Sequence, residues 1–133
     1  MTKIFFCISF LFLLACEKEY SYDNPPPGSF VYKAYDTTGR EVRIGWVRFD
    51  VNGEQVTGEY DIRNADGSLL DVFSPPMGSF SGTMRSLDFA FAIKFFEHSG
   101  TMQGGVIKGV WTMTSTYAMP ILGTFELSPS VAT

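Results

Sequence analysis

One short pattern recurs four times in the sequence: an apolar residue, any residue, glycine, any residue, and then an aromatic residue or methionine. The four copies span residues 56–60, 80–84, 107–111 and 121–125. Side chains of a β-strand alternate between two faces, so the first, third and fifth residues of each copy share one face. An inward glycine leaves room for a ring from the neighbouring strand of a small barrel. The pattern therefore predicts an all-β domain, with Gly58, Gly82, Gly109 and Gly123 facing its interior.

Period-two alternation of apolar residues extends over most of the chain, and no stretch of ten residues after residue 16 has a helical period. The expected strands are residues 30–36, 42–51, 56–62, 69–73, 80–84, 87–95, 101–104, 107–114 and 121–127. Tight turns join these segments, as at Asn52-Gly53, a pair that favours a hairpin. We therefore predict an antiparallel up-and-down meander closed into a small barrel of about eight strands.

The alternation also predicts which side chains point inward. The apolar face changes between Trp46 and Val47, which predicts a β-bulge near Gly45. The rings expected in the barrel interior are Tyr60, Phe89, Phe91, Trp111 and Phe125.

His98 is the only histidine, and we expect it in an exposed turn at residues 97–100. A Ser-His-Asp or Cys-His site would need this histidine beside an ordered partner, and a zinc site needs several His or Cys ligands. The net charge of −4 gives no electrostatic reason to bind nucleic acid. We therefore predict no enzymatic activity, no metal site, no cofactor and no nucleic-acid partner.

The amino terminus has the features of a secretory signal: Lys3, an apolar run over residues 4–14, and the sequence Leu13-Leu14-Ala15-Cys16. The run is shorter than the about 20 residues that a membrane span needs. The sequence ending at Cys16 resembles the lipobox of bacterial lipoproteins. This resemblance implies a signal peptide over residues 1–15, a diacylglyceryl group and an acylated amino group on Cys16, and a lipid bilayer as the partner of this cysteine.

A proline-rich segment follows the lipobox. Pro25-Pro26-Pro27 favours the extended polyproline II conformation, so we expect a flexible or polyproline II tether over residues 16–28 and a β-barrel domain over residues 29–133. Under the lipoprotein resemblance, Glu17 favours the outer membrane, and residues 16–19 resemble the surface-export signals of Bacteroidota lipoproteins; a solvated linker is the alternative. The expected location is the bacterial outer membrane, lipid-anchored, periplasmic or surface-exposed.

The Val56-Thr57-Gly58-Glu59-Tyr60 stretch resembles the strands of avidin-like and lipocalin-like barrels. This resemblance is loose and extends over most of residues 40–128. Barrels of about eight strands either fill with side chains or hold one small ligand. Two functions therefore stay open. One is a binding module for a small apolar ligand or an envelope protein, and the other is a structural or assembly lipoprotein with a packed barrel.

Successive connections of a meander alternate between the two barrel ends. The expected strands place Asn52-Gly53 and the connections at residues 74–78, 97–100 and 115–120 at one end. Loops with apolar residues on a rigid scaffold are common binding sites. The candidate ligand or partner rim consists of Pro75, Met77, Tyr117 and Met119.

Overall fold

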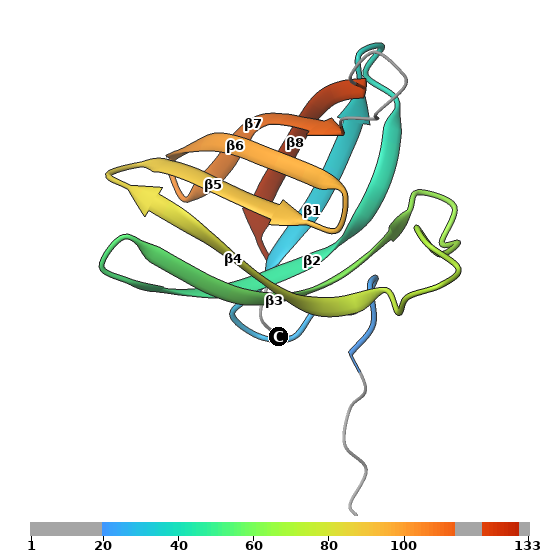
Figure 1. Ribbon diagram of the computed structural model, residues 1–133, viewed down its shortest axis with the longest axis horizontal. Helices are drawn as coiled ribbons and strands as arrows, with labels where there is room; N and C mark the ends of the chain where they lie inside the picture. The colour runs from blue at the N-terminus through green and yellow to red at the C-terminus, as the bar shows by residue number, and fades with distance from the viewer. Residues whose placement is uncertain (1–19, 114–120, 131–133) are drawn as a thin grey trace, which may run out of the picture.

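Eight antiparallel strands follow one another along the chain and close into a barrel, because β8 pairs with β1 (Figure 1). This is a computed structural model, and it describes residues 20–113 and 121–130. The strands are β1 (Phe30–Asp36), β2 (Glu41–Asn52), β3 (Gln55–Asn64), β4 (Met77–Arg85), β5 (Asp88–Ile93), β6 (Phe96–Gln103), β7 (Val106–Met113) and β8 (Ile121–Pro129). The predicted all-β meander of about eight strands is confirmed. None of the described residues forms a helix that could span a membrane.

One expected strand is absent: residues 69–73 belong to the connection between β3 and β4. The edge of β4 that faces β5 is paired only at residues 82–85, and residues 69–73 do not join the rest of that edge. The Asp71 carboxylate accepts hydrogen bonds from the backbone N–H of Phe73 at 2.9 Å and from the Ser74 hydroxyl at 2.9 Å, which turns the chain locally.

The expected bulge near Gly45 lies elsewhere. The β1–β2 register shifts between Ala34 and Tyr35, whose partners are Arg43 and Glu41. The register across Gly45 is continuous on both sides, and this glycine instead allows a close approach to the backbone of β3. Arg43 therefore faces the barrel interior, and Trp46 faces outward, where it is buried without joining the core cluster.

The recurrent glycines pair across the barrel wall with inward rings. Gly58 pairs with Phe80, and Gly82 pairs with Phe91. A Cβ added at Gly58 would lie 2.6 Å from Cε1 of Phe80, so the ring covers the glycine. Rings likewise cover Gly78, which pairs with Tyr60, and Gly123, which pairs with Trp111. Gly109 pairs with Phe125 in the register but lies against the backbone of Ser99 and Gly100. Glycine and ring thus alternate across neighbouring strands, which lets large side chains fill a narrow barrel.

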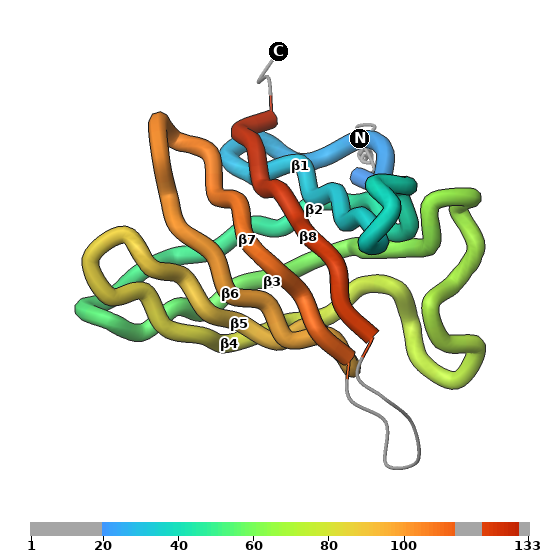
Figure 2. The backbone as a smooth tube through the Cα atoms, turned by 90° about the horizontal axis from the view of Figure 1, so that it is seen from above, coloured from blue at the N-terminus to red at the C-terminus, as the bar shows by residue number. Residues whose placement is uncertain are grey.

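The two barrel ends differ. The end that carries the β1–β2, β3–β4, β5–β6 and β7–β8 connections is called the loop end, and the opposite end is called the turn end. Figure 2 shows the β3–β4 connection projecting beyond the strands. The turn end has three two-residue turns, at residues 53–54, 86–87 and 104–105. Asn52-Gly53 was predicted to share a barrel end with residues 74–78, but it lies at the opposite end, the turn end. The prediction was wrong because it counted a strand at residues 69–73 that is absent.

Candidate functional site

His98 lies inside the barrel, and its predicted place in an exposed turn was wrong. The β5–β6 turn consists of Lys94 and Phe95, so β6 starts at Phe96 and continues through residues 97–100. His98 is 3% exposed and stacks on Phe91, with ring centroids 4.4 Å apart. Phe96, His98 and Gly100 alternate with their neighbours, which is the pattern that predicts an inward histidine. The pattern is hard to recognise because the neighbours of the histidine are polar.

A polar network crosses the core at this point. The Tyr32 hydroxyl lies 2.7 Å from Nε2 of His98, and Nε and Nη2 of Arg43 each donate to the same hydroxyl oxygen at 3.3 Å. Because Arg43 has no acceptor to offer, the hydroxyl hydrogen is directed to His98, whose Nε2 is then the acceptor. The Arg43 guanidinium also packs over two rings, with Cζ 3.8 Å from the centroid of Phe96 and 4.1 Å from that of Trp111.

Burial sets the charge state of this network. Desolvation, together with the nearby charge of Arg43, lowers the pKa of His98 to about 3, so the imidazole is neutral at physiological pH. Burial also raises the pKa of Tyr32, although Arg43 opposes the shift. All three side chains are buried among core rings. The network therefore lies within the ring-filled interior of the barrel.

The rings that the sequence placed inside the barrel are all in the core cluster: Tyr60, Phe89, Phe91, Trp111 and Phe125. Phe91 stacks with Phe89, with centroids 4.7 Å apart, and meets Phe125 edge-to-face at 5.8 Å, so these three rings are in continuous contact. Among the described residues, these rings therefore occupy the centre of the barrel interior.

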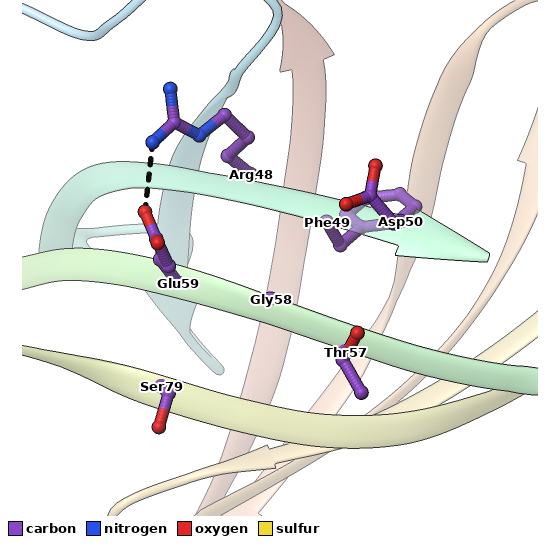
Figure 3. Close-up of a pocket in the computed structure, with 7 residues that line it drawn as sticks. All are labelled: Arg48, Phe49, Asp50, Thr57, Gly58, Glu59 and Ser79. Carbon is purple, nitrogen blue, oxygen red and sulfur yellow. Dashed lines mark hydrogen bonds and ion pairs between the residues drawn. The ribbon is translucent and has the colours of Figure 1, made fainter.

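The hollow drawn in Figure 3 lies on the outer face of the barrel, across β2, β3 and β4. Its volume is about 310 Å³. Arg48 and Glu59 point toward each other at its edge, and Nη2 of Arg48 donates to Oε1 of Glu59 at 2.8 Å. Both side chains are exposed, and exposed ion pairs of this type contribute little. Arg48 and Glu59 are paired with each other, and Asp50 is the other charged side chain of the lining.

Exposed apolar side chains gather at the loop end. Phe73 is 94% exposed and Val72 is 79% exposed, both in the β3–β4 connection. The exposed apolar residues of this end are Leu69, Val72, Phe73, Met77, Phe95, Ile121 and Leu122. The turn end has Val51 and Leu87 as exposed large apolar residues among those described.

Two of the predicted rim residues, Pro75 and Met77, are exposed at the loop end. Tyr117 and Met119 lie outside the described residues, as does Cys16. The residues that sequence reasoning missed are Leu69, Val72, Phe73, Phe95, Ile121 and Leu122. They were missed because they were assigned to strands, in which apolar residues are expected to face inward.

Residues 20–29 pack against the outside of the barrel. The guanidinium of Arg63 lies 4.8 Å from the ring centroid of Tyr22, and Pro26 is fully buried. The Ser29 hydroxyl donates to the Pro26 carbonyl at 2.6 Å. Proline has few conformations to lose on docking, so a proline-rich segment orders readily on a surface.

This segment, called the strap, runs from the loop end to the turn end. The Tyr22 hydroxyl lies against Gly67 in the β3–β4 connection, and Ser29 precedes the first residue of β1 at the turn end. On the outer face of β3 beside the strap, Asp61 is 1% exposed. Its burial raises its pKa; Arg63 opposes this shift and Asp23 of the strap adds to it. The outward carboxylate is therefore covered and not solvated.

No family model, no curated protein and no solved structure matches this chain.

Proposed function

We propose that this chain is a lipid-anchored lipoprotein of the bacterial outer membrane whose barrel is a non-enzymatic binding module that acts through its loop end. The proposal rests on the difference between the barrel interior and the surface of the loop end. The interior is occupied by rings, while seven large apolar side chains are exposed at one end. Exposed apolar groups gathered in one region are typical of interaction sites.

The contrast favours surface binding over capture of a small ligand inside the barrel. An interior ligand would have to displace rings that contact one another, such as Phe91 and Phe125. Removing large side chains from a packed core is strongly destabilising. The apolar partner of this module is therefore an extended surface in the envelope that meets the loop end.

The anchor in this proposal rests on the sequence Leu13-Leu14-Ala15-Cys16. The Cys16→Ser variant should accumulate as an unprocessed form, because the thioether cannot form. Mass spectrometry of the wild-type amino-terminal peptide should give a diacylglyceryl group on Cys16. A processed chain without lipid would refute the anchor.

The loop end is tested by placing a photo-crosslinking amino acid at Phe73 in cells. The matched control carries the same group at Leu87, which is 53% exposed at the turn end. The variant at Phe73 should give abundant crosslinks, and the control at Leu87 should give few. Equal crosslinking at both positions would mean that the loop end has no special role.

A second candidate function is a structural lipoprotein that binds nothing at its loop end. The filled interior supports it equally, because a packed barrel is also what a purely structural domain needs. The same experiment separates the two functions, since a structural domain predicts weak crosslinking at both positions. Under either function, native mass spectrometry of the purified protein should give only the combined mass of the protein and its acyl groups.

A further inference from the structure

We propose that the partner of the loop end is the lipid bilayer that holds the acyl anchor, so that Val72 and Phe73 insert among the lipid headgroups and acyl chains. This inference rests on the proposed function, because it names the partner of the same surface. The barrel would then rest on the membrane by its loop end, with its turn end in the aqueous phase.

The strap begins at the loop end of the barrel. Tyr22 lies against Gly67 and under Arg63, at the loop-end side of β3. Tyr22 follows Cys16 by six positions, and an extended chain of that length reaches at most about 20 Å. The acylated cysteine is therefore held near the loop end. A tether that began at Phe30 would instead have brought the bilayer to the turn end.

The loop that carries Phe73 is held in place by polar contacts behind it. The Lys94 ammonium donates to the Ser74 hydroxyl at 2.7 Å and to the Pro75 carbonyl at 3.0 Å. Asp71 accepts from the Phe73 N–H, as described above. These bonds fix the backbone while the Phe73 ring remains 94% exposed. A ring presented in this way loses little conformational freedom when it enters an apolar phase.

The charges around the loop end indicate how the contact works. Asp66 and Asp71 have pKa values lowered by hydrogen bonds to nearby hydroxyl and backbone groups, so both are anionic at neutral pH. Arg40 is paired with Asp36, and Lys94 is occupied by the loop. Among the described residues, this end lacks the cluster of basic side chains that anionic lipids attract. Docking is therefore apolar and shallow, and anionic lipid does not strengthen it.

Because the tether is short, a weak affinity of the loop end for the bilayer is sufficient for docking. An acyl anchor converts docking into an intramolecular event, for which effective concentrations reach the millimolar range. Only a few side chains then need to enter the interface. A soluble protein partner would have to compete with a bilayer that is always within reach.

The test uses a property of the mature chain: Cys7 lies in the signal, and Cys16 carries the thioether. A Phe73→Cys variant therefore has one free thiol, and Leu87→Cys is the matched control at the turn end. Each lipidated protein is labelled with a nitroxide and reconstituted in phosphatidylcholine vesicles at less than one molecule per vesicle. Collision with oxygen reports the lipid phase, and collision with a nickel chelate reports water. A third variant, Met77→Cys, repeats the measurement at a second rim position.

The label at position 73 should be accessible to oxygen and shielded from the nickel chelate, and the label at position 87 should behave in the opposite way. Added phosphatidylglycerol should not increase the shielding at position 73, because Asp66 and Asp71 are anionic. An acylated protein whose position 73 remains in water overturns the membrane docking but leaves the anchor intact. The absence of an acyl group on Cys16 overturns both proposals.

Two further outcomes would assign the loop end to a different partner and overturn the docking. Shielding in native membranes that is lost in pure vesicles would indicate a protein partner. Shielding that appears only at several molecules per vesicle would indicate a second copy of the chain. Circular dichroism of each labelled protein checks that the barrel is intact.

Discussion

The Tyr32 hydroxyl and Nε2 of His98 lie 2.7 Å apart inside the barrel, on strands that are far apart in the sequence. Arg43 donates to the same hydroxyl, so one oxygen links β1, β2 and β6. A hydrogen-bonded group of this kind in a ring-filled core fixes how the rings are arranged, because its members have few alternative partners.

The network makes stability depend on pH. The pKa of His98 falls from 6.5 to about 3 on folding. Below pH 6.5 the unfolded chain binds a proton that the folded protein does not, so stability decreases as the pH falls toward 3. The free energy of unfolding should fall by up to about 1.4 kcal/mol per pH unit in this window. Denaturant melts of the wild type between pH 7 and pH 4 measure the slope.

The control for this prediction is His98→Gln, which retains a hydrogen-bond acceptor and does not titrate. Its slope should be shallower than that of the wild type by the His98 contribution. The carboxylates Asp36, Asp66 and Asp71 have lowered pKa values and destabilise both proteins in acid, so they cancel in the comparison. Identical slopes for the two proteins would show that His98 is not buried as described.

Arg43 should not tolerate lysine. Lysine keeps the charge but loses the planar contact with Phe96 and Trp111 and the two donors to Tyr32. We expect Arg43→Lys to lower the free energy of unfolding by about 1–3 kcal/mol. The exposed Arg48→Lys is the control and should change it by less than about 0.5 kcal/mol. Urea melts followed by tryptophan fluorescence test both, and a similar small effect for the two would contradict the prediction.

The pairing of Gly78 with Tyr60 allows a test of the glycine and ring alternation. A Cβ at Gly78 would lie 2.7 Å from the Tyr60 hydroxyl and 2.9 Å from its Cζ, and its nearest neighbours are all atoms of this one side chain. Gly78→Ala should therefore destabilise the barrel by about 1–3 kcal/mol through overpacking.

The free-energy cost of Gly78→Ala should be smaller when Tyr60 is replaced by leucine, because the added Cβ clashes with the Tyr60 ring. Gly109→Ala is the control, since the Cβ there would meet the backbone of Ser99 and Gly100. The cost of Gly109→Ala should be the same in the wild type and in the Tyr60→Leu background. A double-mutant cycle in urea measures the coupling, and no coupling between Gly78→Ala and Tyr60→Leu would exclude a ring above the glycine.

The barrel could be predicted from the sequence because its local signals agree. The period-two alternation and the inward glycines both indicate strands, and β1 occupies the same residues as its predicted strand. The strand expected at residues 69–73 is absent for a local reason. Its apolar residues satisfy the pattern, but the hydrogen bonds of Asp71 to Phe73 and Ser74 turn the chain.

His98 and the loop end could not be predicted for a different reason. Lys94 occupies the β5–β6 turn with a φ of 54°, a conformation that lysine rarely adopts. The residue types at this position therefore do not predict a turn. The turn was therefore placed too late in the sequence, which put His98 outside the barrel. Phe95 was assigned to the expected strand over residues 87–95 for the same reason, although it is exposed in the turn.

The last prediction concerns the contact between Lys94 and the β3–β4 connection. The Lys94→Asn variant keeps a residue that tolerates positive φ but removes the ammonium that binds Ser74 and Pro75. The connection should then open more often, while the barrel keeps its core. We expect faster amide exchange and faster proteolysis at residues 69–76, with a change in global stability of less than about 0.5 kcal/mol. Lys108→Asn, on the outer face of β7, is the control and should leave exchange in this connection unchanged. Unaltered exchange in Lys94→Asn would mean that other contacts hold the loop, and a large loss of global stability would place Lys94 in the structural core of the barrel.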